Sequence, residues 1–254
     1  RREVAARRGG DLVLTLDQSL QYEVERQLTA QVEKAKAKGG MVVVTDVTTG
    51  DVLAMATAVG ATPTVPAHPA RASDQNLPLT AVYEPGSTNK VITVASALEQ
   101  GAITENTTLA VPASLKIADA LFEDHAPHAP TLTVKDIMRE SSNVGAIEIA
   151  RLVGKDKLDQ YLRAFGFGTP TAIHFAGESA GILLDPADYT DTSMGSVPVG
   201  NGLAVTAMQM LDVFATVANG GVSRPPRLVA ASIDASGVRH DRPPAPGHRV
   251  VSTT

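Results

Sequence analysis

One segment, Glu84-Pro85-Gly86-Ser87-Thr88-Asn89-Lys90, constrains this chain more than any other. Its Pro-Gly pair breaks the preceding structure, and the apolar spacing that follows predicts a helix over residues 87–100. Residues three apart lie on one face of a helix, so the Ser87 hydroxyl and the Lys90 amine are predicted to meet there. A serine paired with a lysine in this way is one arrangement for nucleophilic catalysis, with the amine as base.

The sequence around these residues resembles the transpeptidase domain of class B penicillin-binding proteins, the enzymes that cross-link bacterial peptidoglycan. Ser-x-x-Lys alone is expected by chance about once in a chain of this length. Here Ser87 and Lys90 match the family's nucleophile motif, and Ser141 and Asn143 match its second motif in the family's order. Further segments that are similar to the family are 14–21, 46–55, 166–168, 177–181, 200–202 with Thr206 and Gln209, so the resemblance covers residues 11–254.

The resemblance implies an α/β chain with the fold shared by serine β-lactamases and penicillin-binding proteins. In this fold an antiparallel sheet is flanked by helices, with an all-α lobe beside it. Residues 1–10 are expected to be a tail or the remnant of a preceding linker, and residues 11–254 to be the transpeptidase domain. The active site is expected at the seam between sheet and helical lobe.

The implied activity is that of a peptidoglycan D,D-transpeptidase. Ser87 would attack the D-Ala-D-Ala end of a stem peptide and form an acyl-enzyme, and β-lactams would acylate the same serine. Lys90 can take the Ser87 proton only if it is partly neutral, which burial favours. In this scheme Ser141 passes the proton to the leaving amine, and Asn143 binds a substrate carbonyl and accepts a hydrogen bond from Lys90.

The family's third motif, Lys-Thr-Gly or His-Thr-Gly on an inner strand, is absent, because no Lys or His here precedes Thr-Gly or Ser-Gly. The final residues 250–254 end in a hydroxyl run that is typical of a helix N-cap. We therefore expect the domain to be C-terminally incomplete. The missing strand would supply the second oxyanion donor, whose loss costs about 10²–10³ in rate, so this chain alone is expected to be a poor enzyme.

Composition excludes several classes of function. The 254 residues are 43% hydrophobic and 19% charged, with a net charge of -5, which argues against a nucleic-acid partner. There is no cysteine, hence no disulfide or thiolate metal site, and we expect neither metal nor cofactor. The resemblance implies an extracytoplasmic protein whose membrane anchor is not in this sequence. Its implied partners are stem peptides, β-lactams, a membrane glycosyltransferase and the divisome or elongation proteins.

Hydrophobic periodicity and turn residues predict the elements between these motifs. The predicted helices cover 17–38, 87–100, 133–139, 144–153, 155–165 and 201–219. A hairpin is expected over 41–46 and 51–57, and a second over 225–238; residues 171–175 could form a strand. Residues 58–78 are predicted to form a loop, and residues 104–130 are predicted to be mostly irregular.

Four alternatives remain open at this point. A non-catalytic β-lactam or muropeptide sensor could use the same fold and the same serine. Residues 177–181 match Gly-x-Ser-x-Gly, the nucleophile elbow of α/β-hydrolases, which would make Ser179 the nucleophile of an esterase. A class A β-lactamase would need a further Glu, for which Glu178 is the candidate, although a structural Glu in a turn is favoured. His125 and His128 could form a metal clip, but the surrounding prolines favour a surface loop.

Overall fold

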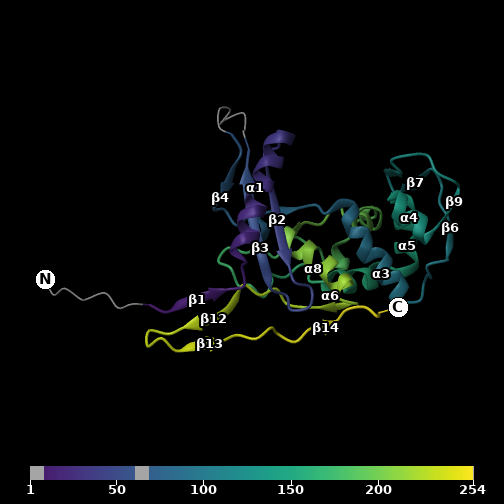
Figure 1. Ribbon diagram of the computed structural model, residues 1–254. Coiled ribbons are helices and arrows are strands. Elements are labelled where there is room, and N and C mark those ends of the chain that lie inside the picture. The colour runs from purple at the N-terminus through teal and green to yellow at the C-terminus, as the bar shows by residue number, and fades with distance from the viewer. Residues whose placement is uncertain (1–8, 61–68, 254) are drawn as a thin grey trace. The chain divides into compact units, whose positions relative to one another are not determined.

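The computed structural model describes residues 9–60 and 69–253, and its chain divides into two compact units (Figure 1). Unit 1 comprises Arg1–Pro78 and Arg224–Gly247, and unit 2 comprises Leu79–Ser223 and His248–Thr254. Residues 1–8 of the predicted tail and 61–68 of the predicted loop lie outside the described residues. Whether residues 11–254 form one domain stays a prediction, so each unit is treated by itself.

In unit 1 a long helix packs against a three-stranded sheet in the order β2-β3-β4 (Figure 1). The helix is α1 (Gln18–Ala35), and Asp17 caps it by accepting a 2.9 Å hydrogen bond from the Leu20 N–H. Its predicted end at residue 38 is wrong, because Lys36 adopts a left-handed conformation and ends the helix. Gly39 instead begins β2, where a side chain would meet the Ala58 carbonyl oxygen at 2.8 Å.

The predicted first hairpin is confirmed as β2 (Gly39–Thr45) and β3 (Val52–Val59), which pair antiparallel. β4 (Arg71–Ser73) pairs with the end of β3, so the prediction of a continuous loop over 58–78 is wrong there. Apolar side chains between α1 and this sheet form the core of unit 1: Val24, Leu28, Val32, Val42, Ala56, Ala58 and Ala70.

A second sheet of unit 1 has the order β1-β12-β13. It consists of β1 (Asp11–Leu14), β12 (Val229–Ile233) and β13 (Arg239–Asp241), which confirms the predicted late hairpin. Arg227 precedes β12 and forms a two-pronged ion pair with Asp51, at 2.5 and 2.7 Å. The Val52 N–H also donates to the Arg227 carbonyl oxygen at 2.9 Å, so backbone and side chain together join the two sheets.

Unit 2 is mostly helical, and α3 runs through its centre. Ile92 of α3 packs in one buried cluster with α6 and α8, while Val94 and Ala97 pack in a second cluster with α4 and α5. The helices of this unit are α2 (Leu77–Thr80, which begins in unit 1), α3 (Lys90–Glu99), α4 (Val134–Glu140), α5 (Asn143–Val153), α6 (Lys155–Ala164), α7 (Ser193–Ser196) and α8 (Ala207–Ala218). Three 3-10 turns accompany them: η1 (Gly86–Asn89), η2 (Pro186–Asp188) and η3 (Val197–Val199).

Short antiparallel strand pairs complete unit 2, and several were not predicted. The pairs are β5 (Val82–Tyr83) with β10 (Val205–Thr206), β6 (Thr108–Ala110) with β9 (Thr131–Thr133), β7 (Ser114–Ile117) with β8 (Ala120–Glu123), and β11 (Val222–Ser223) with β14 (His248–Arg249). The prediction that residues 104–130 are mostly irregular is confirmed for the greater part of the segment, although it missed β6, β7 and β8. Strands of two to four residues are too short to show the alternation that identifies a strand. No strand forms over 171–175, and those residues make turns.

None of the described helices combines the length and apolarity that crossing a membrane requires.

Candidate active site

Ser87 lies in the turn η1, immediately before α3, and its side chain is exposed. The predicted helix over 87–100 is thus divided into a 3-10 turn and the α-helix that begins at Lys90. Two hydrogen bonds with residues 200–202 hold this turn and the residues before it in place. The Gly86 N–H donates to the Gly200 carbonyl oxygen at 3.0 Å, and the Glu84 carboxylate accepts from the Gly202 N–H at 2.8 Å. Within the described residues the Ser87 hydroxyl has no hydrogen-bond partner, so it is open to an incoming molecule.

Lys90 is buried, with 1% of its surface exposed, and its ammonium group reaches the second motif. Its Nζ donates to the Ser141 carbonyl oxygen at 2.5 Å, to Ser141 Oγ at 3.1 Å and to Asn143 Oδ1 at 2.7 Å. The Lys90 backbone N–H donates to the Ser87 carbonyl oxygen. The structure therefore brings Lys90, Ser141 and Asn143 into direct contact, with Ser87 three residues before Lys90 in the turn η1 that leads into α3.

The environment of Lys90 suits a base. Burial lowers the pKa of the Lys90 amine to about 8, and the negative charge of Asp124 opposes part of this effect. At pH 7 a group with this pKa is neutral in roughly one molecule in ten, whereas an ordinary lysine is almost wholly charged. An amine that is neutral for part of the time can accept a proton from a serine hydroxyl.

The second motif lies in a tight connection between two helices. Thr133 caps α4 by accepting a hydrogen bond from the Asp136 N–H, and α4 ends where Ser141 adopts a left-handed conformation with φ 56°. Ser142 then caps α5, its Oγ accepting a 2.8 Å hydrogen bond from the Gly145 N–H. Gly145 is required at this point, because a Cβ would lie 2.6 Å from the Ile137 side chain. This turn directs the Ser141 carbonyl and the Asn143 side chain toward Lys90.

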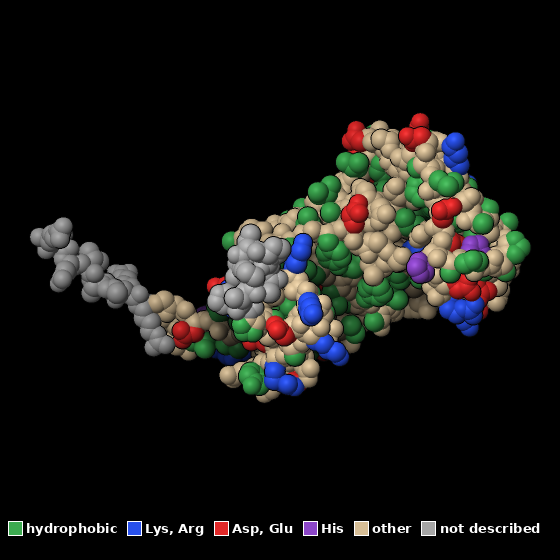
Figure 2. Space-filling model, turned by 90° about the horizontal axis from the view of Figure 1, so that it is seen from above, with side chains coloured by type: hydrophobic (Ala, Val, Ile, Leu, Met, Phe, Trp, Pro, Cys, Tyr) green, Lys and Arg blue, Asp and Glu red, His purple; other side chains and the backbone are tan. Residues whose placement is uncertain are grey.

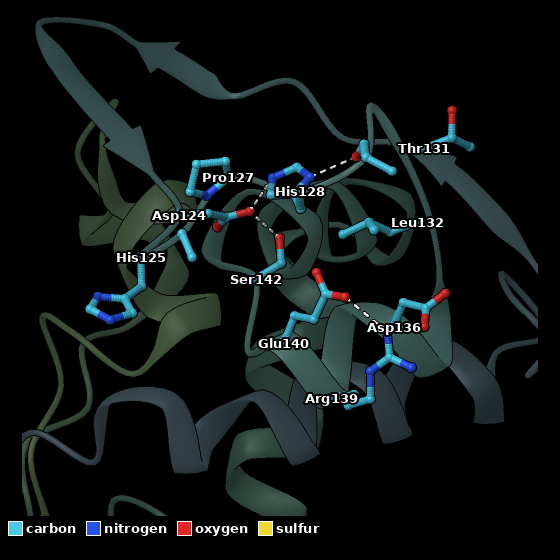
Figure 3. A pocket seen from close by; sticks show the side chains of 12 residues that line it. Asp124, His125, Pro127, His128, Thr131, Leu132, Asp136, Arg139, Glu140 and Ser142 are labelled. Atoms are coloured by element: carbon cyan, nitrogen blue, oxygen red, sulfur yellow. Dashed lines mark hydrogen bonds and ion pairs between the residues drawn. The ribbon is translucent and has the colours of Figure 1, made fainter.

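The sequence analysis missed Asp124, which lies behind the second motif (Figure 3). Its carboxylate accepts hydrogen bonds from Ser142 Oγ at 2.6 Å, the Asn143 N–H at 2.5 Å and the Val144 N–H at 3.0 Å. His128 Nε2 lies 2.7 Å from the same carboxylate. The only sequence signal was that Asp124 lies four residues before His128. No short-range pattern in the sequence connects either residue to the second motif.

The two histidines of this loop differ in their surroundings. His125 is exposed and points away from Asp124 (Figure 3), and the space-filling view shows histidine surface beside acidic and basic side chains (Figure 2). The His128 side chain is only 5% exposed, so the prediction of a surface loop is wrong for this residue. Among the residues that the structure describes, no cluster of His, Asp and Glu side chains is arranged to hold a metal ion.

Residues 177–181 form a turn and not a nucleophile elbow. No strand precedes Ser179 within residues 171–178, and residues 180–185 form no helix after it. Ser179 Oγ accepts a 3.1 Å hydrogen bond from the Gly181 N–H. Glu178 has the structural role favoured from the sequence, since its Oε1 accepts from the Thr171 N–H at 2.7 Å and from Thr171 Oγ1 at 2.5 Å. The esterase hypothesis therefore has no geometric basis.

Comparison with known proteins decides the family. The sequence profile described as "Penicillin binding protein transpeptidase domain" matches residues 40–254. The chain belongs to the penicillin-binding protein transpeptidase family. Its curated relatives include penicillin-binding protein PbpB of Mycolicibacterium smegmatis, 34% identical over 248 residues, which are 96% of this chain and 38% of that protein. Peptidoglycan D,D-transpeptidase FtsI of Escherichia coli K12 is 33% identical over 241 residues, covering 94% of this chain and 39% of the relative.

Solved structures of penicillin-binding proteins have the same fold. Penicillin-binding protein 3 of Mycobacterium tuberculosis, in complex with aztreonam, superposes with a TM-score of 0.87 at 30% identity. The match covers 99% of this chain and 56% of that one. The predicted class, a penicillin-binding-protein-like transpeptidase fold, is therefore confirmed. The chain spans less than two-fifths of the length of the two curated relatives named above.

Proposed function

We propose that this chain is the serine D,D-transpeptidase domain of a class B penicillin-binding protein, with Ser87 as nucleophile and Lys90 as its base. The observation that carries this proposal is the buried Lys90 amine, bonded to Ser141 and Asn143 and placed one turn after an exposed serine. The substrate class is the D-Ala-D-Ala end of a peptidoglycan stem peptide, and β-lactams are the inhibitors.

Each step of the proposed reaction uses these groups. Ser87 Oγ bonds to the carbonyl carbon of the terminal peptide bond while its proton passes to the neutral Lys90 amine. The C–N bond then breaks, and a proton returns from Lys90 through the Ser141 hydroxyl, 3.1 Å away, to the leaving D-Ala amine. The acyl group stays on Ser87 until the amine of a second stem peptide attacks it, which releases the cross-linked product and restores the serine.

Two features favour the charge that develops during acylation. Ser87 lies at the amino end of the turn that continues into α3, where the helix dipole stabilises negative charge. Asn143 donates from Nδ2 to the Glu123 carbonyl oxygen at 3.0 Å, which fixes its amide. The other hydrogen of Nδ2 is then available to a substrate carbonyl, in keeping with the substrate-binding role assigned to Asn143.

The location and the further partners are also proposals. The relatives are named as penicillin-binding proteins and peptidoglycan transpeptidases, and one is solved with aztreonam. From this kinship we infer that the chain is part of an extracytoplasmic enzyme that is anchored to the cell membrane in its full length. We infer further that this enzyme works with a membrane glycosyltransferase and with the divisome or elongation proteins.

Covalent labelling by a fluorescent penicillin tests the assignment of Ser87. We expect wild-type protein and Ser179→Ala to be labelled and Ser87→Ala to remain unlabelled, with circular dichroism showing that all three are folded. Intact-mass measurement should show one added acyl group in wild type and in Ser179→Ala, and no added mass in Ser87→Ala. Equal labelling of Ser87→Ala, or no labelling of folded wild type, would overturn the proposal for this chain.

A further inference from the structure

Asp124 occupies the amino end of α5, directly beside the second motif. Its carboxylate accepts from the first two peptide N–H groups of the helix, those of Asn143 and Val144, and from the Ser142 hydroxyl. These N–H groups have no partner within the helix, and the helix dipole favours an anion there. The Ser142 hydroxyl, in turn, accepts from the Gly145 N–H. One carboxylate thus organises the whole first turn of α5.

The residues that Asp124 holds are the neighbours of those that bind Lys90. All three hydrogen bonds of Lys90 Nζ go to Ser141 and Asn143, which flank Ser142 on either side. Glu123, the residue before Asp124, accepts from the Asn143 amide and sets its orientation. The end of β8 therefore determines both the backbone and the side-chain amide that face the Lys90 amine.

His128 completes the arrangement on the far side of Asp124 (Figure 3). Its Nδ1 lies 2.7 Å from the Ala129 carbonyl oxygen and its Nε2 lies 2.7 Å from Asp124 Oδ2. Both ring nitrogens therefore lie close to oxygen atoms of the same loop. Side-chain exposures of 5% for His128 and 6% for Asp124 keep this pair largely away from solvent.

We propose that Asp124 is the positioning residue of the second motif: it holds Ser142 and the first turn of α5 so that Ser141 and Asn143 bind Lys90. His128 lies against the same carboxylate, with Nε2 2.7 Å from Asp124 Oδ2. The role rests on the proposed function, because the setting of Lys90 matters only if Lys90 acts as the base. Other charged groups border the same cavity of about 470 Å³, namely His125, Asp136, Arg139 and Glu140. Of these, Asp136, Arg139 and Glu140 pair with one another.

The decisive experiment measures the titration of Lys90 directly, independently of any reaction. Protein labelled with ¹³C at the lysine ε-carbon is titrated by NMR, and Lys90→Arg identifies the signal. We expect Asp124→Asn to lower the apparent pKa of Lys90 by about half a unit to one unit, because a negative charge is lost. His128→Gln leaves the hydrogen bonds of Asp124 to α5 in place, so it should shift the Lys90 pKa less than Asp124→Asn does.

Thr133→Ala is the matched control, since it removes the cap of the neighbouring helix α4 without touching the second motif. It should lower the melting temperature and leave the Lys90 titration unchanged. The rate of labelling by fluorescent penicillin should fall at least about tenfold in Asp124→Asn and stay near wild type in Thr133→Ala. If Asp124→Asn does not fold, Ser142→Ala takes its place, because it removes the hydrogen bond between Ser142 and Asp124 and should also slow labelling.

Two results would overturn the positioning role. One is an unchanged Lys90 titration in Asp124→Asn, with only the melting temperature lowered, as for an ordinary helix cap. The other is an equally large shift of the Lys90 titration in Thr133→Ala. Failure of the proposed function is recognised separately, because it would leave wild type unlabelled, or Ser87→Ala labelled, whatever the Lys90 titration shows.

Discussion

Asn143 Oδ1 lies 2.7 Å from Lys90 Nζ, although the two residues are 53 positions apart in the chain. Lys90 begins the central helix of unit 2, and Asn143 begins α5, which packs against that helix. A neutral amide oxygen at this distance binds the lysine whether the amine is charged or neutral. A carboxylate in its place would instead favour the charged form of the Lys90 amine.

Asn143→Asp should raise the pKa of Lys90 and suppress acylation at neutral pH. A carboxylate 2.7 Å from Nζ favours the ammonium form, by about one to three pKa units for a close opposite charge. The pH profile of penicillin labelling should move upward accordingly. Asn106→Asp is the matched control, since it adds a carboxylate at an exposed position of the same unit. A profile that coincides with that of wild type would contradict the prediction.

Wild-type labelling should rise with pH and level off above about pH 8. The reason is that burial lowers the pKa of Lys90 to about 8, and only the neutral amine accepts the Ser87 proton. Lys90→Arg should be inactive across the whole range, because a guanidinium does not lose its proton in proteins. Stopped-flow labelling between pH 6 and 10 measures both, and a flat wild-type profile would argue against Lys90 as the base.

Gly200→Ala should destabilise the protein and disturb the nucleophile turn. Gly200 has φ 82°, and a Cβ there would lie 2.1 Å from the Gly86 carbonyl oxygen, next to Ser87. Backbone strain and the overlap together should lower the free energy of unfolding by about 2–4 kcal/mol. Denaturant titration measures this loss.

Gly101→Ala separates the two contributions to that loss. Gly101 also has a positive φ, 64°, but a Cβ there meets nothing within 4 Å. Its cost should be about 1–2 kcal/mol, the backbone strain alone, and penicillin labelling should be unaffected. Equal losses for the two glycine variants would show that the Gly86–Gly200 contact is not tight in solution.

Asp212→Asn should stabilise the protein at pH 7.5 but not at pH 4. Burial raises the pKa of Asp212 to about 8, and the nearby Glu178 carboxylate adds to the effect. Between about pH 4 and pH 8 the native protein holds a proton that the unfolded chain has lost, so stability falls as pH rises. Asparagine has no such proton to lose, so the melting temperature of the variant should exceed that of wild type at pH 7.5.

Thermal unfolding at pH 7.5 and at pH 4 measures the effect of Asp212→Asn on the melting temperature. Glu105→Gln is the control, because it removes a carboxylate at an exposed position. The control should change the melting temperature only slightly, and by the same amount at both pH values. An Asp212→Asn variant whose melting temperature is lower than that of wild type at pH 7.5 would show that the ionised carboxylate is stabilising.

Local chemistry determined much of what the sequence predicted. Asp17 and Thr133 cap their helices because a side-chain oxygen reaches an N–H three residues on, which depends on no distant contact. The spacing of Ser87 and Lys90 likewise places the two residues one turn apart on the element that begins the central helix. Ser141 and Asn143 were named through the resemblance to the family, and the resemblance also indicated the fold.

Tertiary packing decided the rest. The contact of Lys90 with Ser141 and Asn143 and the hydrogen bonds of Asp124 to α5 join segments that no periodicity connects. The strands over 108–123 form because neighbouring segments satisfy their backbone groups, although each is too short to be recognised alone. Burial of Lys90 is also a product of packing, and it converts an ordinary lysine into a group that can accept a proton. Candidates for the reacting groups could thus be named from the sequence, whereas their contacts and orientation depend on the surrounding fold.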